Sequence, residues 1–157
     1  MYCNTFNAVK LFSTTIICIA FCLNSFSQNH SRIDSLARVL ESDIASTARL
    51  NSLIELSLEY FDYDHESCLR YADDAYNLAK ELSDSIQIVK SARIKGQMYR
   101  RIGQLDSSIA VLDEAYQIAK RNRYLYDYKR ILNALAAAYI LKADYDKALE
   151  FNFQSLL

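Results

Sequence analysis

The stretch SSIAVLDEAYQIAK, from Ser107 to Lys120, decides the fold because a close copy of it lies forty residues upstream. The copy, SCLRYADDAYNLAK, runs from Ser67 to Lys80. Ser, Asp, Ala, Tyr, Ala and Lys recur at matched positions, and most other pairs are exchanges such as Leu for Ile or Asp for Glu. A fixed period of this length is typical of arrays in which small structural units stack on one another.

Length and composition favour helices. The 157 residues are enough for one domain or a short array of repeats, and 52% of them are hydrophobic. There is no Pro or Trp and there are only two Gly, whereas sheets with tight turns depend on Gly and Pro. The net charge of -1 gives no overall field that would attract nucleic acid or an acidic membrane surface.

The N-terminal residues have the three-part layout of a secretory signal peptide. Basic Lys10 precedes an apolar run over residues 11–23, and the small residues Ser25 and Ser27 follow it. A helix of that run is about 20 Å long, which is short of the roughly 30 Å hydrocarbon core of a bilayer. We expect cleavage after Ser27 and export to the periplasm or cell envelope of a bacterium, with no stable membrane span afterwards; retention as an anchor is the alternative.

Cleavage leaves Cys68 as the only cysteine. A single cysteine makes no internal disulfide, so an exported domain of this sequence depends on packing for its stability. The counterparts of Cys68 at the forty-residue spacing are Ser108 and Ala148, both small. We therefore interpret Cys68 as a packing residue at a close helix crossing rather than as a redox thiol.

Apolar residues recur at helical spacing nearly throughout the remainder of the chain. Asp84, Asp106 and Asp144 are typical of helix starts, and Gly103 is typical of a helix stop. No segment alternates apolar and polar residues for long enough to predict a strand. The sequence predicts an all-α fold with helices at 31–41, about 50–61, 69–79, 84–102, 106–121, 124–142 and 145–157.

The duplication has a physical reason, because a pair of short amphipathic helices cannot bury its apolar faces alone. Ala75, Ala115 and Ser155 lie forty residues apart, each small where two helices would press together, and Tyr76 matches Tyr116. We infer three copies of a helix–turn–helix unit, of which the last is incomplete.

These units resemble the tetratricopeptide repeat, which places a small residue three positions before a Tyr and continues with Ala-x-x-x-Phe in the second helix. The middle unit fits with Gly96 and Tyr99, while Ser108 and Leu112 stand in for the Ala and Phe. The other units fit through Ser57, Tyr60, Cys68, Ala72 and Ala75, and through Ala136, Tyr139, Tyr145 and Ala148. The residues expected to define packing in the repeats are Gly96, Tyr99, Gly103, Leu112, Ala115, Ala136, Tyr139, Ala148 and Ala75.

The sequence also departs from the family pattern. Ala92 and Leu132 replace its Trp, Asn152 replaces a large apolar residue, no unit has the closing Pro, and the period is 40 rather than 34. The resemblance implies an α-solenoid. Its predicted organisation is a signal peptide over 1–27, an N-terminal linker and capping helix over 28–45, and repeats over 46–157, divided at about 46–83, 84–123 and 124–157.

Residues for catalysis are scarce. His30 and His65 are the only histidines, and there is no Gly-rich phosphate loop and no paired-cysteine metal spacing. The acidic stretch DYDHES begins at Asp62 and alternates as a calcium loop does, but Ser67 stands where the sharp turn needs Gly. We interpret this stretch as an acidic turn that caps the next helix, and we expect no enzyme activity, cofactor or metal.

Charge is distributed unevenly along the chain. Residues 85–105 carry five basic residues and no acid, whereas residues 62–84 carry seven acids and two basic residues. Compensation between neighbouring helices is one interpretation, with each exposed pair worth about 0–1 kcal/mol. The family resemblance implies another, because its first helices line a concave groove that holds peptides. The residues that would line this groove are Lys90, Arg93, Gln97, Arg100, Arg130 and Asn133.

A basic groove would favour an acidic segment or a C-terminal carboxylate as its ligand. The run YLYDY adds Tyr124, Tyr126 and Tyr128, whose rings cannot all enter the core, so some are expected to face solvent or a partner. The sequence thus predicts a non-enzymatic scaffold in the cell envelope that binds a protein or peptide partner.

Two alternatives stay open. Exported arrays of this kind resemble those that precede a membrane-anchored histidine kinase or a DNA-binding transcriptional regulator, which would make the chain a sensory region. The closing FNFQSLL carries Phe151, Phe153, Leu156 and Leu157 without a capping signal, which predicts further repeats or self-association at this end.

Overall fold

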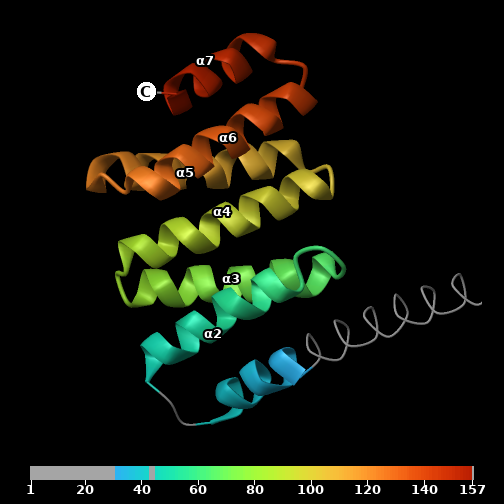
Figure 1. The fold of residues 1–157 in the computed structure, drawn as a ribbon, viewed down its shortest axis with the longest axis vertical. Helices are drawn as coiled ribbons and strands as arrows, with labels where there is room; N and C mark the ends of the chain where they lie inside the picture. Colours follow the sequence, from blue (N-terminus) through green and yellow to red (C-terminus); the bar gives the residue numbers. More distant parts are fainter. Residues whose placement is uncertain (1–30, 43–44, 157) are drawn as a thin grey trace, which may run out of the picture.

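The computed structural model describes residues 31–42 and 45–156, so the predicted signal peptide and its cleavage after Ser27 lie outside the described residues. Within these ranges the fold is all-helical and contains no strand. Residues 31–41 form a helical stretch that precedes six longer helices, which stack in chain order (Figure 1). These are α2 (Ser46–Glu59), α3 (His65–Glu81), α4 (Ser85–Arg101), α5 (Leu105–Asn122), α6 (Leu125–Leu141) and α7 (Tyr145–Leu156).

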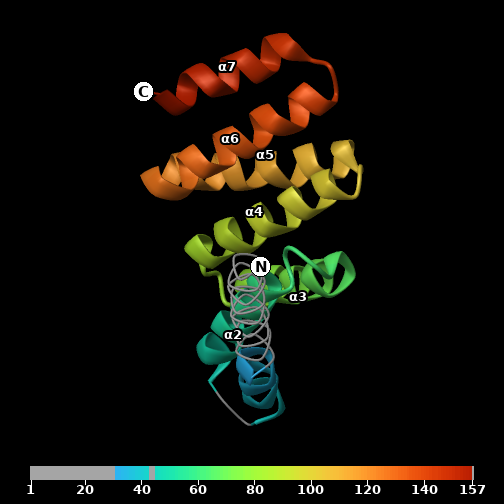
Figure 2. The same cartoon turned by 45° about the vertical axis from the view of Figure 1, so that its right-hand side comes forward.

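The helices form two layers. Each helix packs on the next one along the chain, and the backbone of α4 also comes close to those of α2 and α6, whereas α3, α5 and α7 contact one another only through long side chains. The first helices of successive units therefore lie closer together than the second helices do, and the stack curves with α2, α4 and α6 on its inner side (Figures 1 and 2). This repeat-like arrangement fits an α-solenoid. We call the face formed by α2, α4 and α6 the inner surface.

Side-chain caps begin several of the helices. Asp64 accepts a hydrogen bond from the Ser67 backbone N–H at 3.1 Å, and Asp84 accepts one from that of Gln87 at 3.2 Å. Asp144 accepts from the Lys147 N–H in the same way. The prediction that Asp106 begins a helix was wrong by two residues, because Gln104 occupies the N-cap of α5. Asp106 lies in the first turn, where its carboxylate accepts from Lys142.

Four turn residues adopt a positive φ at intervals of twenty residues: Ser83, Gly103, Arg123 and Ala143. Each follows a helix C-terminus, where a left-handed residue lets the chain reverse direction. The predicted stop at Gly103 is confirmed by its φ of 80°. Gly103 is exposed and a Cβ there would meet nothing within 4 Å, so its role is conformational and not the packing role expected from the repeat pattern.

Small residues allow the helices of each unit to approach closely. A Cβ on Gly96 would lie 2.5 Å from Cγ of Leu112, which is fully buried. Beside it, the Ser108 hydroxyl donates to the Gly96 carbonyl oxygen at 2.7 Å. Ala75 and Ala115 are also fully buried, as the forty-residue spacing predicts. The core consists of two clusters, one around α2 to α4 and one around α3 to α7, and Ile88 packs against both; close backbone contact at small residues is common to them.

The two ends of the stack differ. The stretch 31–41 covers α2. Within this stretch Ile33 is buried, and Arg32 pairs with Glu59 of α2 at 3.0 Å. On α7, four large apolar side chains are exposed: Tyr145, Leu149, Phe153 and Leu156. Self-association at this end stays a prediction. Among the described residues, no helix combines the length and the hydropathy that a bilayer span requires.

Candidate functional site

The basic residues of α4 divide into two sets with different surroundings. Lys95 Nζ lies 2.6 Å from Asp73 of α3, and Arg101 Nη2 lies 2.9 Å from Asp62 in the turn that precedes α3. Arg101 Nη1 also donates to the Phe61 carbonyl oxygen at 3.1 Å. For these two residues, the compensation between neighbouring helices that the charge pattern predicts is confirmed.

The second set consists of Lys90, Arg93 and Arg100, which follow helical spacing along α4. In the described part of the chain, no carboxylate lies within 4 Å of these residues or of Arg130 in α6. Arg93 faces α6, because the charges of Arg130 and Asp127 both act on it. Arg93 therefore lies on the inner surface, and helical spacing places Lys90 and Arg100 on the same side of α4 as Arg93.

Arg93 is the least ordinary member of this set because it is only 5% exposed. Its Nη1 donates to Gln97 Oε1 at 3.1 Å, and its Nε is buried and has no hydrogen-bond partner. A buried guanidinium normally has a carboxylate partner, since a charge loses its hydration when water is excluded. Among the residues that the structure describes, the one side chain that bonds to Arg93 is the neutral amide of Gln97.

The electrostatic surroundings of Arg93 disfavour its charge. Burial lowers the pKa of its guanidinium, and the positive charge of Arg130 lowers it further. The negative charge of Asp127, which is itself 6% exposed, acts in the opposite direction. An additional negative charge beside Arg93 would offset both the burial of its guanidinium and the repulsion from Arg130.

Two further side chains, near the two ends of α4, have buried polar atoms without a partner in the described part of the chain. Arg100 Nε and Gln87 Oε1 are buried, and neither makes a hydrogen bond within the described residues. Arg100 offers a donor and Gln87 an acceptor. A peptide segment provides both complements, because its carbonyl and carboxylate oxygens accept hydrogen bonds and its N–H groups donate them.

The neighbouring helices extend this polar surface. In α6, Asn133 is exposed and Arg130 Nη1 donates to the Tyr126 hydroxyl at 3.1 Å. Tyr126 is 72% exposed, which confirms that part of the YLYDY run faces outward. In α2, Asn51 Oδ1 accepts a hydrogen bond from Gln87 Nε2 at 3.0 Å.

Sequence reasoning missed Asn51, Gln87 and Asp127 as members of the inner surface. The signal that would have found them is the register of the repeat. Gln87 and Asp127 are forty residues apart, each three positions before a predicted groove residue, Lys90 or Arg130. Because equivalent positions of stacked units face the same side, the register alone places both residues beside the predicted ones.

The acidic turn before α3 and Cys68, which the sequence analysis considered for metal binding and redox chemistry, lie where they support the fold. The acidic turn before α3 caps that helix through Asp64, as predicted. Within the described ranges, no group of three or more His, Cys, Asp and Glu side chains is arranged to hold a metal ion. Cys68 is fully buried and unbonded to another cysteine.

Burial raises the pKa of the Cys68 thiol from 9.0 to about 12. We expect iodoacetamide at pH 8.5 to label Cys68 only after the protein is unfolded, because the reactive thiolate is suppressed in the core. The free energy of unfolding should fall by about 1 kcal/mol per pH unit between pH 9 and 12, since only the unfolded thiol ionises there. Mass spectrometry of the Cys68 peptide measures the labelling, and urea titrations measure the free energy of unfolding. Cys68→Ala should remove the fall in that free energy between pH 9 and 12. Equal labelling of the native and unfolded protein would contradict the packing role.

A scan of protein-family models and a search of curated proteins find no match to this chain. The inner surface therefore has to be interpreted from its own residues.

Proposed function

We propose that this chain is an exported, non-enzymatic interaction protein of the tetratricopeptide-repeat type. Its inner surface binds an acidic segment of a protein partner in the cell envelope. The segment lies along α4 and contacts α2 and α6 at its ends. This binding needs no cofactor, because recognition uses only side-chain charge and hydrogen bonds.

The observation that carries this proposal is the burial of Arg93 without a carboxylate. Asp127 acts on Arg93 only from beyond 4 Å, and burying a charge without a directly bonded counterion costs free energy. Such a cost persists where binding a ligand offsets it. Charge-assisted hydrogen bonds from a guanidinium to a carboxylate are about twice as strong as neutral ones. Lys90 and Arg100 lie on the same side of α4 and also lack carboxylate partners, so several acidic residues of one segment have complements.

Apolar residues flank the basic part of the surface. Leu58 in α2 is 47% exposed and Ile140 in α6 is 49% exposed. Ile140 corresponds to Arg100 forty residues upstream, and Leu58 corresponds to Gln97 thirty-nine residues downstream, because the turn in the first unit is one residue shorter; the two therefore extend the same face on either side. We therefore expect the bound segment to have acidic residues at its centre and apolar residues toward its ends.

Photo-crosslinking in the cell that makes the protein tests this function. A photoreactive amino acid is introduced at Asn133 on the inner surface or, as a matched control, at Gln117, which is exposed on α5 of the outer layer. We expect a discrete crosslinked species from position 133 that is absent from position 117. Charge reversal at Arg100 in the position-133 variant should reduce its yield. Equal products from both positions would contradict a role for the inner surface.

A further inference from the structure

The repeat places equivalent side chains at two junctions between successive second helices, and the two junctions differ in charge. Where α3 meets α5, the Tyr76 hydroxyl donates to a Glu114 carboxylate oxygen at 2.5 Å. Lys80 Nζ lies 3.1 Å from the other oxygen of the same carboxylate. This first junction is complete, because one acid satisfies both the tyrosine and the lysine.

The second junction, where α5 meets α7, keeps the tyrosine and the lysine and loses the acid. The Tyr116 hydroxyl donates to Gln154 Oε1 at 3.2 Å, and Lys120 Nζ donates to the Tyr116 hydroxyl at 3.3 Å. Gln154 occupies the place of Glu114 forty residues later, and its amide group donates to Glu150. No carboxylate of the described residues lies within 4 Å of Lys120.

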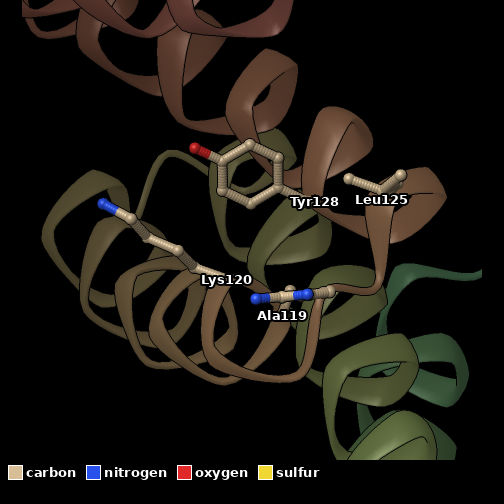
Figure 3. A pocket seen from close by; sticks show the side chains of 5 residues that line it. Ala119, Lys120, Leu125 and Tyr128 are labelled. Atoms are coloured by element: carbon tan, nitrogen blue, oxygen red, sulfur yellow. The ribbon is translucent and has the colours of Figure 1, made fainter.

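A cavity of about 160 Å³ adjoins the unpaired lysine. It lies where the end of α5 meets the start of α6 and is lined by Ala119, Lys120, Arg123, Leu125 and Tyr128 (Figure 3). Nearly all of its wall is apolar, because Lys120 and Arg123 line it mainly with the carbon atoms of their side chains and their charged groups lie at its rim. An apolar cavity of similar size, about 150 Å³, is large enough to hold benzene.

The residues that form this cavity are also specific to the second junction. The counterparts of Arg123, Leu125 and Tyr128 forty residues upstream are Ser83, Ser85 and Ile88. The turn beside the second junction has therefore gained one cation, Arg123, and larger apolar side chains. Glu114 pairs with Lys80 at the first junction, whereas at the second Glu150 lies beside Gln154 and no carboxylate of the described residues lies within 4 Å of Lys120.

We propose that the cavity between α5 and α6 binds a carboxylate that carries one benzene-sized apolar group, with the carboxylate on Lys120 and Arg123 and the apolar group against Leu125, Ala119 and Tyr128. The bound carboxylate gives Lys120 an anionic partner, as Glu114 does for Lys80 at the first junction. This site is separate from the inner surface, and it does not depend on the function proposed for that surface. Its ligand is either a free small acid or the C-terminal Phe of a polypeptide, which have the same chemistry.

Phenylacetate is the probe for the free acid, and its binding is followed through the backbone amide signals of the protein by NMR. We expect saturable shifts at residues 119–128 and an affinity at least about tenfold higher than that of benzyl alcohol, which lacks the charge, or acetate, which lacks the ring. An acetylated tripeptide that ends in Phe distinguishes the two sources. Tighter binding of the tripeptide than of phenylacetate indicates a polypeptide C-terminus, and the reverse indicates a free acid.

Two variants connect the binding to the missing carboxylate. Lys120→Gln removes one cation and should weaken phenylacetate binding about tenfold. Gln154→Glu restores the acid of the first junction, so it should weaken binding to a similar extent while the urea midpoint is unchanged or higher. Lys80→Gln, at the complete junction, is the matched control and should leave binding unchanged. The proposal is overturned if phenylacetate causes no saturable shifts at residues 119–128, or if Gln154→Glu binds it as tightly as the unsubstituted protein does.

Discussion

Replacing Gly96 by Ala is expected to lower the free energy of unfolding by about 2 kcal/mol, although Ala is the better helix former by about 1 kcal/mol. The added Cβ would overlap the Leu112 side chain at 2.5 Å, and Leu112 is fully buried and cannot turn away. Urea unfolding followed by circular dichroism measures the change. No loss of stability would mean that α4 and α5 do not approach as closely as the repeat requires.

A double-mutant cycle shows whether the effect arises at this contact. Leu112→Ala alone should cost about 2–5 kcal/mol, because it leaves a cavity in the core. In the Gly96→Ala background the same substitution should cost less, since the smaller side chain makes room for the new methyl group. Gly103→Ala is the control. It should cost about 1 kcal/mol through its positive φ and show no coupling to Leu112.

Replacing Arg93 by Met is expected to change stability and binding in opposite directions. Removing a buried, unpaired charge in favour of an apolar side chain should raise the free energy of unfolding by about 1 kcal/mol. The same change should weaken binding of an acidic peptide at least about tenfold, because a charge-assisted hydrogen bond is lost. The peptide for this measurement has four Glu at its centre and Leu toward both ends, and fluorescence anisotropy gives its affinity.

Lys95→Met is the matched control for this prediction. Lys95 lies on the same helix, but it pairs with Asp73 at 2.6 Å and belongs to the contact with α3. Its loss leaves a partly covered carboxylate without a partner, so it should destabilise the protein and leave the peptide affinity unchanged. If Arg93→Met destabilises the protein and has no effect on binding, Arg93 is a structural residue and the proposed function loses its main support.

Much of the fold was predictable because the sequence repeats it. The forty-residue spacing of Ala75 and Ala115 predicted close helix crossings, and both residues are fully buried. Asp84 and Gly103 marked the ends of α4 correctly. The start of α5 was misplaced because Asp suits both the N-cap and the first turn, and only the backbone decides between Gln104 and Asp106.

The candidate site was less predictable, for physical reasons. The resemblance to tetratricopeptide repeats implied that Lys90, Arg93 and Arg100 line one face of a helix. It did not show that Arg93 is buried while Lys95 and Arg101 are paired, since burial and pairing depend on how α3 and α6 pack against α4. Likewise, the sequence alone does not single out the exchange of Glu114 for Gln154 among the many differences between the units. The structure does, because each of the two residues accepts a hydrogen bond from the tyrosine of the preceding unit.

The central claim is that the inner surface binds acidic peptide segments, and an NMR titration at low salt tests it most directly. The amide signals of the protein are followed as the Glu-containing peptide is added and, separately, a counterpart in which Gln replaces each Glu. The account predicts saturable shifts at Lys90, Arg93, Gln97 and Arg100 and at facing residues of α6, with binding at least about tenfold tighter for the Glu peptide. Shifts confined to α3, α5 and α7, or equal affinity for the two peptides, would contradict it.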